Sequence, residues 1–164
     1  MDKIELKKMG NAFVPINIKP ISDTTMRPID FKVDTGADVT TISKEDLRDF
    51  GYDLDWIVLN AVIFDHADKP TTASGEKVNA GYVKLPLLNI LGYEAKNWPF
   101  LIVMDEDHDF RNLLGRDLLV GFNFCFDFDN NHFTIEKTKT FIPRIPLQPT
   151  QEINEIKTSK LDER

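Results

Sequence analysis

The sequence contains a single cysteine, Cys125, fewer basic than acidic residues, and no long apolar run. One cysteine cannot form an internal disulfide, which excludes a disulfide-stapled secreted scaffold. No stretch approaches the roughly 18–20 consecutive apolar residues of a membrane-spanning helix, and the N-terminus lacks the apolar segment of a signal peptide. With 20 Lys+Arg against 27 Asp+Glu the formal net charge is −7, which disfavours nucleic acid and anionic membranes as partners. We therefore expect a cytoplasmic protein.

The chain length of 164 residues fits one domain and is too short for two ordinary domains. Three prolines lie between residues 143 and 149, and the sequence then becomes polar. We predict one domain over residues 1–147, followed by a mobile polar tail over residues 148–164.

Most of the predicted elements are strands, which makes the expected fold class all-β. β-Branched and aromatic residues favour strands at 12–19, 26–33, 56–64 and 78–90. Pro15 suggests that the first of these is an edge strand. The turn at Ser74-Gly75 predicts a hairpin between the last two. Short helices are expected after the N-cap Ser43 and over residues 116–120.

A second hairpin is predicted near the end of the domain. Phe122, Phe124, Phe126 and Phe128 alternate with polar residues and Cys125, and Asn130-Asn131 supplies a turn before residues 132–135. We expect these phenylalanines and Cys125 to be buried in the core.

The stretch most informative about chemistry is Asp34-Thr35-Gly36, which follows the apolar strand ending at Val33. A carboxylate on a tight turn between buried strands needs hydrogen-bond partners, and the Thr35 hydroxyl and Gly36 N–H can supply them. This arrangement would hold Asp34 as a catalytic group is held. A loop aspartate that merely binds its own turn is the ordinary alternative, and the tripeptide alone does not decide between them.

A second motif, Asn112-Leu113-Leu114-Gly115-Arg116-Asp117, lies some eighty residues further on. Together, in this order and spacing, the two motifs resemble those of the retroviral-type aspartic proteases, the retropepsins, and their cellular and bacterial relatives. The resemblance covers about residues 12–135. It implies a single-domain closed β-barrel with a flap hairpin and one short helix near the C-terminal end.

The resemblance also implies roles for individual residues. Asp34 corresponds to the catalytic aspartate, Thr35 to the residue that locks the two catalytic loops together across a dimer, and Gly36 to the turn glycine. Ala37 and Asp38 correspond to substrate-binding positions, and Asp38 should pair with Arg116. We expect that pair to be at least partly buried. The flap should be the hairpin over residues 71–78, with Ser74 and Gly75 at its tip and in contact with substrate.

A protein of this family would be an aspartic endopeptidase that acts as a homodimer, with Asp34 of each subunit forming the catalytic dyad. It would cleave extended polypeptides, with its own chain among the candidate substrates, and would need no cofactor or metal. Two subunits that each carry a net charge of −7 repel each other, so the dimer interface should be mainly apolar. Residues 141–147 are a candidate for part of this interface. Ala37 cannot donate a hydrogen bond to the dyad, so we expect activity at mildly acidic to near-neutral pH.

Two alternatives remain open from the sequence. One is a dimeric peptide-binding or scaffolding module that keeps the fold but cleaves nothing. The other is an all-β interaction domain in which Asp-Thr-Gly is incidental.

A metal site is not expected. The acids at 105, 107 and 109 resemble a calcium loop, but the glycine and final glutamate positions are Phe110 and Arg116. His66, His108 and His132 share no ligand spacing.

Overall fold

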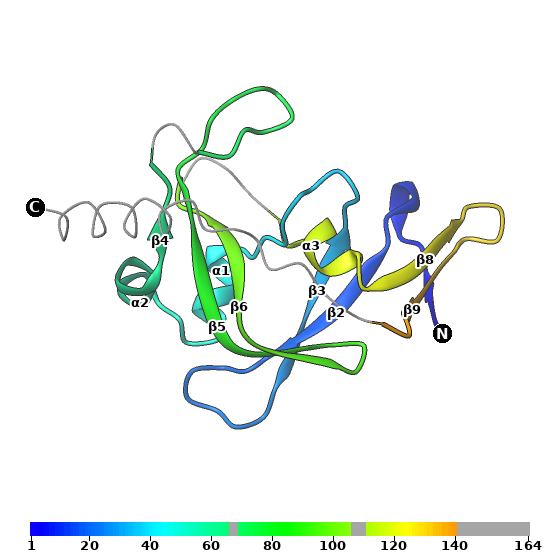
Figure 1. Ribbon diagram of the computed structural model, residues 1–164, viewed down its shortest axis with the longest axis horizontal. Coiled ribbons are helices and arrows are strands. Elements are labelled where there is room, and N and C mark those ends of the chain that lie inside the picture. The colour runs from blue at the N-terminus through cyan, green and yellow to red at the C-terminus, as the bar shows by residue number, and fades with distance from the viewer. Residues whose placement is uncertain (66–68, 106–110, 141–164) are drawn as a thin grey trace, which may run out of the picture.

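The computed structural model describes residues 1–65, 69–105 and 111–140, and it is built mostly of strands (Figure 1). The predicted tail at 148–164, the candidate interface segment at 141–147 and most of the acidic stretch at 105–109 lie outside the described residues. Among the described helices, none is long and apolar enough to cross a membrane.

The larger sheet has the strand order β4-β5-β2-β3-β7, with β6 also paired to β5. Its strands are β2 (Phe13–Ile18), β3 (Arg27–Val33), β4 (Val62–Ile63), β5 (Ala80–Ile90), β6 (Tyr93–Val103) and β7 (Leu113–Leu114). All neighbours are antiparallel except β3 and β7. No closed sheet is found among the described strands, so the closed barrel stays a prediction.

The core lies against this sheet because alternate side chains of its strands are apolar. On β3, the alternation correctly predicts the buried residues Ile29, Phe31 and Val33. The ring centroid of Phe31 lies 6.1 Å from that of Phe100 on β6. The edge position expected for β2 is wrong, because β2 pairs with β3 on one side and with β5 on the other. The β5 register covers only Ile16–Ile18, so Pro15 lies just outside it.

The strand predicted over 56–64 is wrong for most of its length, since α2 (Leu54–Asn60) occupies it and only β4 is extended. Asp53 caps the helix by accepting a hydrogen bond from Trp56 N at 2.9 Å. Ile57 is buried and Trp56 packs on Tyr52 with a centroid distance of 4.6 Å. The N-cap outweighs the β propensity of the following residues.

The long hairpin of the sheet joins β5 to β6, and strand β6 was not predicted. Its turn is Leu91-Gly92, where φ is 48° and 84°, so both residues adopt the left-handed conformation of a tight hairpin turn. Leucine is an unusual residue at such a position, so the sequence did not predict a turn here.

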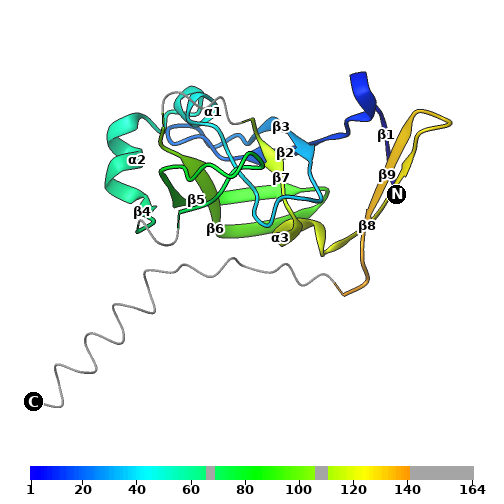
Figure 2. The ribbon, with the colours of Figure 1, turned by 90° about the horizontal axis from the view of Figure 1, so that it is seen from above.

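The smaller sheet contains β1 (Asp2–Glu5), β9 (His132–Lys137) and β8 (Phe122–Asp127), in that order, and stands at one end of the molecule (Figure 2). The predicted hairpin with its Asn130-Asn131 turn is confirmed. The expected burial of its side chains is wrong in part: Phe122 is buried, but Phe124, Phe128 and Cys125 are exposed. Strand β8 is an edge strand among the described residues, so only part of its apolar face meets the core.

Both predicted short helices are confirmed as α1 (Lys44–Asp49) and α3 (Arg116–Leu119). The predicted N-cap Ser43 accepts a hydrogen bond from Asp46 N at 3.2 Å. A single 3-10 turn, η1 (Lys8–Gly10), lies between β1 and β2.

Candidate active site

Asp34 is placed by two strands that come from distant parts of the sequence. Strand β3 ends one residue before it, and β7 runs parallel to β3 with Val33 opposite Leu114. The Asp34 N–H donates to the Leu114 carbonyl at 3.1 Å. The two sequence motifs are therefore joined by main-chain hydrogen bonds, and these bonds fix the position of the Asp34 main chain.

The turn after β3 fixes the Asp34 side chain. Its Oδ1 accepts a hydrogen bond from the Gly36 N–H at 2.9 Å, and the Ala37 N–H donates to the Asp34 carbonyl at 3.2 Å. A Cβ on Gly36 would lie 3.2 Å from that same Oδ1, so glycine keeps the approach open. Asp34 is half-buried, and the neighbouring Thr35 is exposed, with no hydrogen bond from its hydroxyl among the described residues.

Asp38 and Arg116 form an ion pair between the loop and helix α3. Their side chains are 78% and 57% exposed, so the expected burial of this pair is wrong. Because solvent screens an exposed ion pair, this pair adds little to the stability of the fold. Its main effect is to orient the two side chains. A main-chain hydrogen bond also joins the loop to helix α3: Arg116 N donates to the Ala37 carbonyl at 2.9 Å.

A buried polar cluster lies behind the loop. The Thr40 hydroxyl donates to Asp117 Oδ1 at 2.6 Å and accepts from the Gly115 N–H at 3.1 Å. Leu118 N also donates to Asp117 Oδ1, at 2.9 Å. A Cβ on Gly115 would come within 2.4 Å of the Val39 carbonyl carbon, so this position needs glycine for close approach.

Burial raises the pKa of Asp117 above its ordinary value, and the hydrogen bonds from Thr40 and Leu118 oppose that rise only in part. Asp117 Oδ2 is buried and has no hydrogen-bond partner among the described residues. Burial, and then the charge of Asp117, raise the pKa of Tyr82 to about 12. Tyr82 therefore keeps its proton throughout the physiological pH range.

The predicted flap segment forms a small hairpin. Thr71 pairs with Lys77, Thr72 N donates to the Glu76 carbonyl at 2.8 Å, and Gly75 N donates to the Thr72 carbonyl at 2.9 Å. Gly75 has a φ of +86°, so it supplies the left-handed residue that ends the turn.

The base of this hairpin is attached to the end of β6. Asn79 donates two hydrogen bonds to the Asp105 carboxylate, from its main-chain N at 2.8 Å and from Nδ2 at 2.6 Å. Met104 N donates to the Asn79 carbonyl at 2.7 Å. The hairpin is thus anchored where it leaves the sheet.

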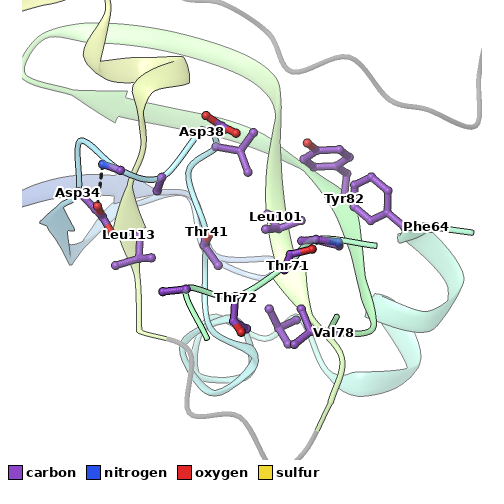
Figure 3. Close-up of a pocket in the computed structure, with 16 residues that line it drawn as sticks. Asp34, Asp38, Thr41, Phe64, Thr71, Thr72, Val78, Tyr82, Leu101 and Leu113 are labelled. Atoms are coloured by element: carbon purple, nitrogen blue, oxygen red, sulfur yellow. Dashed lines mark hydrogen bonds between the residues drawn. The ribbon is translucent and has the colours of Figure 1, made fainter. Parts of the chain in front are cut away.

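A cleft of about 750 Å³ lies between the Asp34 loop and this hairpin (Figure 3). Figure 3 shows Asp34 at one side of the cleft, Tyr82 and Phe64 at the other, and Thr71 and Thr72 along it. Phe64 packs edge-on against Tyr82 with ring centroids 5.1 Å apart. The lining combines residues of the loop, the hairpin and the sheet: Asp34, Gly36, Ala37, Asp38, Val39, Thr41, Phe64, Pro70, Thr71, Thr72, Ala73, Val78, Tyr82, Leu101, Val103 and Leu113.

The structure brings half of the predicted site residues to this cleft. Asp34, Gly36, Ala37 and Asp38 line it. The other four do not: Thr35, Ser74, Gly75 and Arg116. The hairpin and the residues beside it contribute residues 70–73 and Val78 to the lining instead.

The apolar lining was missed by sequence reasoning. Tyr82 and Phe64 belong to segments read only as strands, and Leu101 and Val103 belong to β6, which was not predicted. The alternation in β5 and β6 could have identified inward-facing positions once their pairing was known.

The arrangement presents one fixed carboxylate, open to a cleft with apolar walls. A carboxylate of this kind can act as a general base or acid toward a water or a carbonyl group in the cleft. Within the described residues, no group of three or more His, Cys, Asp or Glu side chains is placed to hold a metal ion.

Comparison with known proteins gives a family and a fold. Residues 24–120 match the model of the gag-polyprotein putative aspartyl protease family. The fold is similar to that of a retropepsin-like aspartic protease from Rickettsia conorii, with 26% identity, a TM-score of 0.57, and 82% of this chain and 97% of that chain covered. The retroviral protease-like domain of Ddi1 from Leishmania major aligns at 17% identity with a TM-score of 0.47, covering 87% of this chain and 95% of that chain. No curated protein sequence matches the chain.

Proposed function

The chain belongs to the gag-polyprotein putative aspartyl protease family, and from this membership we propose that it is an aspartic endopeptidase that works as a homodimer. Asp34 of each subunit supplies one carboxylate of the catalytic dyad. The substrate is an extended polypeptide, and the reaction is hydrolysis of a peptide bond.

The observation that carries this proposal is the position of Asp34. Its Oδ1 is held by the Gly36 N–H at 2.9 Å, on a loop that lines a cleft facing the hairpin at 71–77. This bond closes the turn of Asp34 itself and also holds the carboxylate on the cleft wall, which is the placement that a catalytic group needs. The exposed Thr35 hydroxyl beside it is available to a second subunit.

The proposed mechanism follows from charge repulsion between the two carboxylates. Two such groups about 3 Å apart cannot both ionise, so they share one proton. The ionised member accepts a proton from a water molecule as that water attacks the scissile carbonyl carbon. The protonated member donates its proton to the carbonyl oxygen as negative charge develops there. The dyad titrates as a unit, and the reaction requires no metal or cofactor.

Substrate binding would use the shape of the cleft. The 71–77 hairpin closes it on one side, and an extended peptide can add main-chain hydrogen bonds to such a hairpin. The walls formed by Tyr82, Phe64 and Leu101 favour apolar side chains in the neighbouring positions of the peptide.

Cleavage of a peptide library by the purified chain tests the proposal, with the Asp34→Asn variant as control. We expect the wild-type chain to cleave and the variant to lose activity by at least about a hundredfold, because both carboxylates of the dyad, one from each subunit, are replaced. Arg116→Lys, which keeps the charge paired with Asp38, should retain much more activity. If wild type and Asp34→Asn bind the same peptides and neither cleaves, the chain is a peptide-binding module instead.

A further inference from the structure

Helix α2 presents apolar side chains to solvent where the outer face of a surface helix is ordinarily polar. Leu54, Val58 and Leu59 are 55%, 60% and 83% exposed. Ile63, on the adjoining strand β4, is exposed as well, so four of the ten large apolar side chains exposed within the described residues fall in one ten-residue stretch. Ile57 is the buried residue of the helix, so the core covers one side of α2 only. A helix that is apolar all round is usually covered all round, which indicates a partner for the uncovered side.

The three exposed residues of the helix form one surface, which we call the α2 face. Successive residues of a helix turn by about 100° around its axis, so Val58 lies about 40° from Leu54 and Leu59 about 140° from it. The buried Ile57 lies on the other side of Leu54, turned toward the core. The α2 face therefore points away from the core along the whole helix.

The charged residues around the α2 face are all acidic. Residues 51–65 contain Asp53, Asp55 and Asp65 and no lysine or arginine. All three side chains are exposed, and none forms an ion pair with a basic side chain among the described residues. Two copies of the chain packed through this face would bring like charges together. The surface instead favours an apolar segment that carries lysine or arginine at its flanks.

The α2 face is connected to the cleft through β4. Helix α2 is followed by β4, and Phe64, directly after β4, lines the cleft and packs against Tyr82. Figure 1 shows α2 beside β4, which is the end strand in the described order of the larger sheet. Since Phe64 is five residues after Leu59, their Cα atoms lie at most about 18 Å apart. Roughly six extended residues of a peptide that leaves the cleft at Phe64 are enough to reach the α2 face.

We propose that the α2 face binds a second segment of the substrate polypeptide, apolar and flanked by lysine or arginine, while the cleft holds the peptide bond to be cleaved. The cleft selects the side chains next to that bond. The α2 face adds a requirement several residues away, so the preferred substrates carry two separate recognised segments. This inference rests on the proposed function, because it takes the polypeptide in the cleft to be a substrate.

Binding to the α2 face is measured without catalysis in the Asp34→Asn chain. The probe is a fluorescent peptide of leucine, valine and alanine with lysines at both ends, and the matched probe has glutamates in place of the lysines. Fluorescence anisotropy should give a Kd at least tenfold lower for the lysine probe. Combining Asp55→Asn with Asp65→Asn should reduce this preference, because the acids that attract the lysines are removed.

The double variant Val58→Gln/Leu59→Gln removes the apolar surface and keeps residues that suit a helix. It should raise the Kd of the lysine probe by at least tenfold. Met9→Gln is the matched control, since Met9 is also apolar and exposed but lies on η1. A Cβ on the neighbouring Gly10 would lie 2.9 Å from the Phe128 ring, so η1 adjoins the smaller sheet, at the opposite end of the molecule from α2 (Figure 2). This variant should leave the Kd unchanged.

Cleavage by the otherwise wild-type chain tests the same face with a substrate. A core peptide that the chain cleaves is joined, on either side, through about six glycine and serine residues to the lysine-flanked segment. The extension should lower KM at least tenfold and leave kcat unchanged, because the added contact is the same before and during the reaction. Val58→Gln/Leu59→Gln should abolish this gain and cleave the unextended core peptide as the wild type does.

The outcomes separate this site from the proposed activity. A chain that cleaves the core peptide but binds the lysine probe equally with and without Val58→Gln/Leu59→Gln overturns the α2 site and leaves the proposed function intact. Sedimentation that shows a changed oligomeric state in the double variant assigns the face to a second copy. Tighter binding of a synthetic peptide of residues 141–164 than of the lysine probe assigns it to the chain itself, and either result overturns a substrate site. Probe binding at the α2 face without cleavage of any peptide overturns the proposed function and the substrate role together.

Discussion

Replacing Asp117 by asparagine removes one titrating proton from behind the Asp34 loop while keeping the oxygen that Thr40 and Leu118 bind. The structure gives two reasons to expect a pH-dependent effect on stability. The carboxyl is buried, which raises its pKa in the folded state, and its Oδ2 has no partner among the described residues. Ionising this oxygen in the folded protein therefore costs more than ionising it in the unfolded chain.

The sign of the effect follows from linkage. Below the ordinary Asp pKa of about 3.9, both folded and unfolded states hold the proton and the wild type has its full stability. As the pH rises from there through the raised folded-state pKa, the folded state keeps the proton longer and the free energy of unfolding falls. The fall contributes at most about 1.4 kcal/mol per pH unit, since one proton is involved. Asp117→Asn lacks this loss, so its stability relative to wild type should rise with pH and then level off.

Urea unfolding of both proteins at a series of pH values from 4 to 8, at equal protein concentration, measures this difference. Asp117→Ala is the matched comparison. It should show the same pH dependence relative to wild type, displaced downward by about 1–3 kcal/mol for each of the two donors left without an acceptor, Thr40 Oγ1 and Leu118 N. A difference between wild type and Asp117→Asn that stays flat over the whole range would refute the reasoning, because it would mean that folding does not change the proton affinity of Asp117.

Three further predictions concern the loop and the cleft. Gly115→Ala should destabilise the fold by at least about 2 kcal/mol in thermal or urea unfolding, since its Cβ would meet main-chain atoms of Val39 at 2.4 Å; an unchanged midpoint would contradict this contact. Ala37→Ser should shift the acidic limb of the pH–rate profile to lower pH, because a hydroxyl can stabilise the ionised dyad, and a wild-type optimum below about pH 3 would refute the role given to Ala37. Tyr82→Ala should raise KM for peptides with bulky apolar residues, whereas Tyr82→Phe should change it little; equal effects of both variants would assign the role to the hydroxyl rather than to the ring.

The part of the fold that follows from sequence is the part governed by local rules. The apolar alternation of β3 correctly predicted the buried side chains of Ile29, Phe31 and Val33, and Ser43 correctly predicted the start of α1. The prediction failed where one local signal outweighed another. Asp53 caps helix α2, although the residues of that helix have high β propensity. Leu91 adopts a left-handed turn conformation that is usual for asparagine or glycine.

The candidate site was predictable in its motifs but not in its walls. Asp34 and Gly36 meet as their adjacency suggests, because the bond between them spans only two residues. The contact of Thr40 with Asp117 depends on packing across 77 positions, and no periodicity in the sequence announces it. The exposure of Phe124 was mispredicted for a similar reason, since strand alternation indicates which face is apolar but not what covers it.

The parallel pairing of Val33 with Leu114 has a consequence for the order of events during synthesis. Strand β3 leaves the ribosome long before β7. Pairing the two strands closes the long loop between Val33 and Leu114, and closing a loop costs chain entropy before its contacts form. The Asp34 N–H can find its acceptor, the Leu114 carbonyl, only after residue 114 has been made. Until then a growing chain carries Asp34 without the parallel strand that positions it. The Asp34 loop therefore reaches its final geometry only once the second motif has been synthesised.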